Sequence, residues 1–153
     1  MQKNLSVLIF QKILDQHPEH PRVLSALGMV EEQQGRQQQA KAYFERALKA
    51  SPDDLIALNG LGMAYSQSGQ YIEALTYFDK ALALLKKQHG LHPGKPLLEY
   101  AVMCNNKGTV LAKLGETEKA RHAFQDAILH TPENSAYDLP HKNLQKMEQG
   151  DVN

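Results

Sequence analysis

The sequence has no tryptophan, one cysteine and few aromatic side chains. Aromatic residues make up 7% of its 153 residues. Bulky side chains are therefore too few to fill one deep core, which favours a thin core spread along the chain. The single cysteine, Cys104, cannot form an internal disulfide. This excludes a disulfide-stapled secreted scaffold but does not exclude the periplasm.

An excess of one charge and a long apolar run are also missing. The 17 Lys and Arg residues match 17 Asp and Glu residues, so the formal net charge is zero, and no overall field would attract nucleic acid or an anionic membrane. The apolar run at residues 5–10 is broken by Ser6, is too short to span a membrane and precedes no small-residue cleavage site. We therefore expect a cytoplasmic protein with protein or peptide partners, no nucleic-acid partner and no membrane insertion.

A fixed period organises most of the chain. Five sequence positions recur three times, first 34 residues apart and then 46 residues apart, so that 12 residues are inserted before the third copy. Each set of five positions has the order Gly, Gly, Ala, Phe, Ala. The sets are Gly28, Gly35, Ala40, Phe44 and Ala47, then Gly62, Gly69, Ala74, Phe78 and Ala81, then Gly108, Gly115, Ala120, Phe124 and Ala127.

These residue types suit helices packed as hairpins. A glycine inside a helix costs about 1 kcal/mol relative to alanine, so Gly28 indicates a second helix that presses against it. Phe44 follows Ala40 by four residues on one helical face and would fill the space between neighbouring hairpins. Gly35 would provide the positive φ of the turn between the two helices. Each copy of the period therefore predicts one helix hairpin.

The 34-residue unit resembles the tetratricopeptide repeat (TPR). Leu27-Gly28 and Leu61-Gly62 are followed by Ala-x3-Phe, and the match covers most of residues 21–134. The resemblance implies an all-α fold, a right-handed α–α superhelix (TPR solenoid) of about three and a half helix hairpins closed by a C-terminal capping helix. It also implies a scaffold or adaptor that binds other proteins, and no enzymatic activity.

The period divides residues 1–153 into the parts of a single TPR domain. We expect a half repeat at 2–17, repeats at 21–54, 55–88 and 101–134, an insert at 89–100 and the capping helix at 139–149. The insert and the third repeat, with Asn105-Asn106 near its start, resemble kinesin-light-chain-type repeats. That resemblance implies that the helices on both sides of the insert are extended.

In tetratricopeptide arrays the first helix of each hairpin lines a concave groove. The positions that would face it carry uncharged apolar and amide side chains, at Ser25, Met29, Ile56, Asn59, Met63, Val102, Asn105 and Thr109. Asparagine can donate and accept hydrogen bonds together, as a peptide backbone requires. We therefore predict that an extended peptide or partner segment binds there. Two alternatives stay open: a small secretion chaperone for one substrate, and a solvated surface without a ligand.

The sequence predicts no catalytic residue, cofactor or metal site. The segment from Gly90 to Pro96 has the wrong glycine spacing for a phosphate-binding loop and lacks its Ser or Thr. His89 and His92 have no further ligand nearby to complete a metal site. Cys104 is expected to be a small buried hydrophobic residue, because no His or Asn is placed to activate it.

The first predicted helix carries more apolar residues than its counterparts. Val7, Leu8 and Ile9 occupy positions that hold more polar residues in the first and third repeats. A second apolar face is seldom left bare, so we predict a homodimer through this N-terminal helix. The alternatives are that the face holds another protein, or that the chain is part of a longer array whose preceding helix would cover it.

Overall fold

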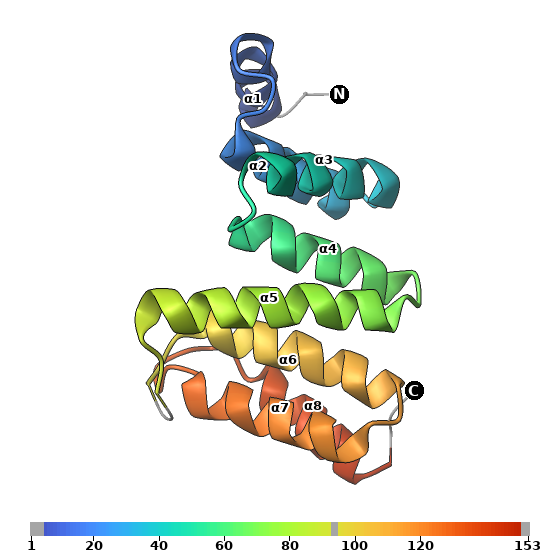
Figure 1. The fold of residues 1–153 in the computed structure, drawn as a ribbon. Helices are drawn as coiled ribbons and strands as arrows, with labels where there is room; N and C mark the ends of the chain where they lie inside the picture. Colours follow the sequence, from blue (N-terminus) through green and yellow to red (C-terminus); the bar gives the residue numbers. More distant parts are fainter. Residues whose placement is uncertain (1–4, 93–94, 151–153) are drawn as a thin grey trace. The chain divides into compact units, whose positions relative to one another are not determined.

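The computed structural model describes residues 5–92 and 95–150, and every regular element within these ranges is an α-helix (Figure 1). The prediction of an all-α fold is confirmed. The helices are α1 (Leu5–Gln16), α2 (Pro21–Gln33), α3 (Gln37–Ala50), α4 (Leu55–Gln67), α5 (Tyr71–His89), α6 (Leu98–Lys113), α7 (Thr117–His130) and α8 (Leu139–Glu148).

The helices form two compact units that divide within α4. The N-terminal unit ends at Ala64 and the C-terminal unit begins at Tyr65. Each unit contains one complete hairpin, α2 with α3 and α6 with α7.

In the N-terminal unit, Phe44 of α3 fills the space that two glycines leave open. A Cβ atom added to Gly28 of α2 would lie 2.5 Å from the Phe44 ring, and one added to Gly60 of α4 would lie 2.3 Å from it. Both distances are far inside van der Waals contact, so only glycine allows this approach. The predicted role of Phe44 between neighbouring hairpins is confirmed.

In the C-terminal unit, α6 and α7 form an equivalent hairpin, and α8 packs mainly on α7 (Figure 1). A Cβ atom added to Gly108 would lie 2.7 Å from the Phe124 ring. Leu144 and Met147 of α8 pack against the cluster that contains Phe124. The helix α8 therefore closes the last core layer with apolar side chains, as a capping helix must.

The turns inside the hairpins need left-handed backbone. Gly35, Gly69 and Gly115 have φ angles of 74°, 77° and 77°, a region that residues with a Cβ atom adopt only with strain. The predicted turn role of these glycines is confirmed.

The helices that flank the insert are longer than their counterparts, as predicted. The helix α5 has 19 residues, whereas α3 and α7 have 14 each. It ends at Gly90, whose φ of 54° stops the helix in the left-handed region. At the other end of the insert, the Leu97 N–H donates a hydrogen bond to the His130 carbonyl oxygen at 2.8 Å, which joins the start of α6 to the end of α7.

Candidate functional site

The first-helix face of the N-terminal unit presents apolar side chains to solvent. Met29 of α2 is 41% exposed and Ile56 of α4 is 48% exposed. Asn59 and Met63 lie on the same face of α4 as Ile56, at spacings of three and seven residues, and are partly buried. The Asn59 side-chain amide donates a weak hydrogen bond to the Met63 sulfur at 3.9 Å. These four predicted groove residues are accessible to a ligand.

Ser25 does not belong to this exposed face, contrary to the sequence prediction. Its side chain is 0% exposed, and its hydroxyl has no hydrogen-bond partner among the residues that the structure describes. A ligand on the surface could not reach it. The sequence pattern correctly placed Ser25 on α2, but it predicted an exposed side chain where the structure has a buried one.

The corresponding face of the C-terminal unit is partly closed. Val102 and Thr109 of α6 are partly buried, and the Thr109 hydroxyl donates to the Asn105 carbonyl oxygen at 3.0 Å. Asn105 itself is only 2% exposed, because α8 reaches it: the Asn143 side-chain amide donates to Asn105 Oδ1 at 2.9 Å. The prediction that Asn105 faces a ligand is therefore wrong, since its side-chain oxygen already bonds to the capping helix.

The predicted self-association residues lie on α1, where Leu8 and Ile9 are exposed and Val7 is partly buried. Leu14, on the same helix, is buried. One face of α1 thus joins the core of the N-terminal unit, and another presents aliphatic side chains to solvent.

A cavity of about 760 Å³ lies in the C-terminal unit between α5, α6 and α7, and the sequence analysis missed it. Its lining residues follow the helical repeat on all three elements, which is the only signal that could have revealed them. They are Leu75, Asp79, Leu82, Ala83 and Lys86 of α5, Tyr100, Cys104, Lys107 and Leu111 of α6, and Lys119, His122, Ala123 and Asp126 of α7.

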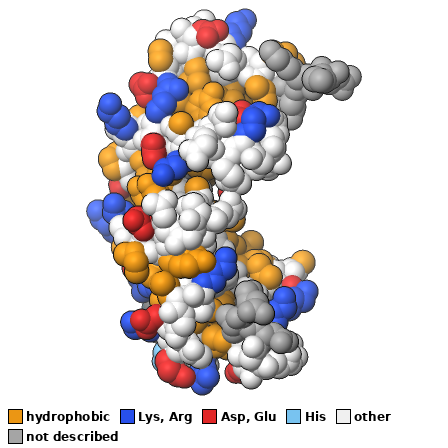
Figure 2. All heavy atoms as spheres, turned by 90° about the vertical axis from the view of Figure 1, so that its right-hand side faces the viewer, with side chains coloured by type: hydrophobic (Ala, Val, Ile, Leu, Met, Phe, Trp, Pro, Cys, Tyr) orange, Lys and Arg blue, Asp and Glu red, His pale blue; other side chains and the backbone are white. Residues whose placement is uncertain are grey.

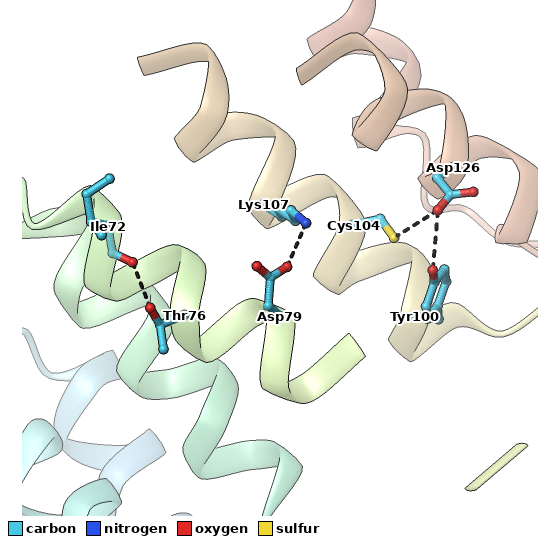
Figure 3. Close-up of polar contacts among 7 residues, drawn as sticks. All are labelled: Ile72, Thr76, Asp79, Tyr100, Cys104, Lys107 and Asp126. Atoms are coloured by element: carbon cyan, nitrogen blue, oxygen red, sulfur yellow. Dashed lines mark hydrogen bonds and ion pairs between the residues drawn. The ribbon is translucent and has the colours of Figure 1, made fainter. Parts of the chain in front are cut away.

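Polar contacts connect the walls of this cavity (Figure 3). Lys107 Nζ of α6 lies 2.6 Å from Asp79 Oδ1 of α5. On the other side, the Tyr100 hydroxyl donates to Asp126 Oδ2 of α7 at 3.3 Å, and the Cys104 thiol donates to the same oxygen at 3.9 Å. Side chains that line the cavity therefore join α6 to α5 and to α7.

The environment of Cys104 suppresses its reactivity. Burial first, and then the negative charge of Asp126, raise the pKa of this thiol to about 12. Burial, followed by the charges of Cys104 and Asp126, likewise raises the pKa of Tyr100. A thiol that stays protonated is a poor nucleophile, so Cys104 has a packing role, as the sequence predicted.

Positively and negatively charged side chains are interspersed on the face drawn in Figure 2. In the described part of the chain, no three His, Cys, Asp or Glu side chains come together as a metal site would require. No helix of that part is both long and apolar enough to cross a bilayer.

The chain contains helix hairpins, contacts of phenylalanine with glycine between their helices, and a capping helix. These three features define a helical-repeat protein. The profile of the tetratricopeptide repeat family matches residues 53–130, and a second profile of the same family matches residues 21–54. The chain belongs to the tetratricopeptide repeat family. The finer resemblance to kinesin light chains stays a prediction.

Solved structures share this fold at low sequence identity. MamA superposes with a TM-score of 0.73 and 20% identity over 93% of this chain and 74% of that chain. YrrB is described as a TPR protein with an unusual peptide-binding site. It superposes with a TM-score of 0.71 and 20% identity, over 93% of this chain and 66% of that chain. The first TPR of Spaghetti (RPAP3) was solved bound to the HSP90 peptide SRMEEVD. It superposes with a TM-score of 0.69 and 18% identity, over 87% of this chain and 94% of that chain. No curated protein matches the sequence.

Proposed function

We propose that the chain is a protein-interaction module whose first-helix face in the N-terminal unit binds a segment of a partner protein. The exposed aliphatic and thioether side chains of Ile56 and Met29 carry this proposal. Methionine is flexible and polarizable, so it adapts to different apolar side chains. Asn59, between Ile56 and Met63 on α4, would hydrogen-bond to the backbone of the bound segment.

The solved relatives support this proposal by analogy. The YrrB structure is described with a peptide-binding site, and the Spaghetti structure contains a bound peptide. The accessible side chains of Met29, Ile56 and Met63 are uncharged. A segment with apolar side chains therefore fits better than an acidic tail. Nothing in the fold favours the alternative of a secretion chaperone.

A photocrosslinking experiment tests the proposal. A photoreactive amino acid at position 56 should crosslink the partner in native lysate, and mass spectrometry should then identify the bound segment. The synthetic segment should bind the purified chain, and Ile56→Glu should weaken this binding by about tenfold or more, since it places a charge at an apolar contact.

Ile72→Glu is the matched control. Ile72 lies on α5 and is 65% exposed, so the substitution adds the same charge at another exposed isoleucine. The two variants should have the same helical content by circular dichroism. Equal affinity of wild type and Ile56→Glu for the identified segment would refute the proposed site.

We also propose that the module acts without catalysis and without a cofactor. Among the described residues, the cysteine thiol is held protonated and no acidic or histidine cluster forms. The proposal of protein rather than nucleic-acid partners rests on the balanced charge of the sequence. The cytoplasmic location stays a prediction.

A further inference from the structure

A carboxylate without a cation, that of Glu32, lies beside the exposed apolar residues of the N-terminal unit. Glu32 follows Met29 on α2 by three residues, and residues three apart are neighbours on a helix surface. It also follows the buried Gly28 by four residues, which places it at the border between the core and the exposed face. Glu32 is accordingly only partly exposed. A ligand that contacts Met29 therefore comes within reach of this carboxylate.

The adjacent carboxylate, that of Glu31, has the partner that Glu32 lacks. Glu31 forms an ion pair with Arg36, and the hydrogen bond from Arg36 holds the pKa of Glu31 below its ordinary value. Among the described residues, the Glu32 carboxylate takes part in no ion pair or hydrogen bond. Burial raises the pKa of Glu32 above the ordinary value of 4.5. The folded chain thus holds a partly desolvated negative charge that none of these residues compensates.

The neighbouring helix of this face, α4, supplies no charge. The Phe44 ring lies between α2 and α4, because a Cβ atom on Gly28 would meet one edge of the ring and a Cβ atom on Gly60 would meet the other. No Asp, Glu, Lys, Arg or His occurs in α4. On α2, which the structure describes in full, the other charged residue without an ion pair is Arg22. It lies ten residues before Glu32, about 15 Å along the helix, and is too far away to pair with it.

We propose that Glu32 selects a partner segment that carries a lysine or arginine beside the apolar residues that contact Met29 and Ile56. This inference rests on the proposed function, since it names the chemistry of the segment that binds the same face. A bound cation would form a charge-assisted hydrogen bond to the carboxylate. Because folding has already removed part of the water around Glu32, this pairing costs less further desolvation. An acidic residue at the same place in the segment would be repelled.

A random peptide library tests the proposal on the full chain. Displayed peptides of about nine residues, which extend over about 30 Å, are selected against the immobilised wild type and two variants. The wild type should enrich apolar residues next to lysine or arginine. Glu32→Gln should keep the apolar preference and lose the basic one, and Glu32→Lys should enrich aspartate or glutamate in its place.

The affinity of one selected peptide measures the strength of the pairing. The basic peptide that the wild type enriches most is labelled with fluorescein and followed by anisotropy. Glu32→Gln should weaken its binding about tenfold or more, because a hydrogen bond between charged groups is lost. Glu73→Gln, at an exposed glutamate of α5 in the other unit, removes the same charge and should change binding less than about twofold. Both variants should keep the circular dichroism of the wild type, since glutamine is a good helix former.

Two further measurements separate pairing from packing. Replacing the basic residue of the peptide by methionine should weaken binding to the wild type but cause little further loss in Glu32→Gln, as a double-mutant cycle requires of two groups that interact. A bound cation also lowers the pKa of Glu32. The affinity of the wild type for the basic peptide should therefore rise as the pH increases above 4.5 and become constant once Glu32 is ionised in the free chain. Glu32→Gln should lack this part of the rise.

The outcomes distinguish the role of Glu32 from the proposed face. If Ile56→Glu weakens binding but wild type and Glu32→Gln bind the basic peptide equally, the role of Glu32 is refuted and the face stands. Equal losses in both proteins on replacing the basic residue would refute the pairing in the same way. A wild type that enriches no peptide, or only peptides whose affinity Ile56→Glu leaves unchanged, would refute the face and this inference with it.

Discussion

The N-terminal and C-terminal units use one repeat but present different surfaces. In the N-terminal unit the first-helix face leaves Met29 and Ile56 open to solvent. In the C-terminal unit α8 reaches the equivalent face and bonds to Asn105, while α5, α6 and α7 line an open cavity. The repeated positions therefore set the core of each hairpin, but the neighbours of that hairpin determine which surface can bind a partner.

The largest expected difference concerns Cys104, which occupies the position of Leu24 and Leu58 in the N-terminal unit. All three side chains are buried. With a pKa of about 12, against 9.0 for an ordinary thiol, the folded protein at pH 8 should react with iodoacetamide about a thousandfold more slowly than the unfolded chain. Mass spectrometry of timed samples measures both rates.

An exposed thiol is the control for this rate. Gln125→Cys, introduced with Cys104→Ser, places a thiol on the exposed side of α7 and should react quickly in the folded protein. Because the folded state holds the Cys104 proton more tightly, the free energy of unfolding should fall as the pH rises from about 9 to about 12. Fast labelling of native Cys104 would contradict its burial.

The next largest effect compares the two phenylalanines that fill the hairpins. Phe44→Ala and Phe124→Ala should each lower the free energy of unfolding by about 3–5 kcal/mol, because each leaves a cavity against glycine. Chemical denaturation followed by circular dichroism measures the loss. Ile72→Ala, at an exposed site, should cost less than about 0.5 kcal/mol. A small loss at only one phenylalanine would show that the two hairpins are not equivalent.

A smaller effect tests the contact that distinguishes the C-terminal unit. Asn143→Ala removes the donor to the buried Asn105 oxygen and should cost about 1 kcal/mol in thermal or denaturant unfolding. Asn134→Ala, at an exposed asparagine outside this contact, should cost almost nothing. The double variant with Asn105→Ala should lose less than the sum of the single variants, since both remove one interaction. Strict additivity would mean that the two side chains do not interact.

The smallest expected effect concerns association through α1, which stays a prediction. Leu8 and Ile9 are exposed there, and burial of this face in a homodimer would give weak affinity, with Kd on the order of micromolar. Light scattering after size exclusion should show a dimer that Leu8→Glu dissociates and Gln11→Glu does not. A monomer at high micromolar concentration in all three proteins would end this hypothesis.

The hairpins could be predicted from the sequence because their contacts are local and have strict size requirements. Gly28 leaves space for Phe44, and Gly35 permits the turn between their helices. The long α5 was also predictable, because the insert and Lys86 remove the usual stop at the end of the helix. These features depend on the size and backbone freedom of residues a few turns apart.

The exposure of individual groove residues could not be obtained in this way. Helical spacing places Ser25 and Met29 on one side of α2, yet only Met29 reaches solvent, because the packing of neighbouring helices determines where that side meets the core. The cavity likewise depends on the separation of α5 and α7, which no periodicity specifies.

By itself, the sequence determined the repeat, the positions of the turns and the helices that form hairpins, since side-chain size and spacing along the chain fix these features. Only the tertiary structure determined that Asn105 is buried and that α5, α6 and α7 line a cavity. The donor to Asn105 lies 38 residues away in α8, and three separate helices line the cavity. The physical reason is that accessibility depends on which distant elements pack together, whereas helix formation depends on neighbours along the chain.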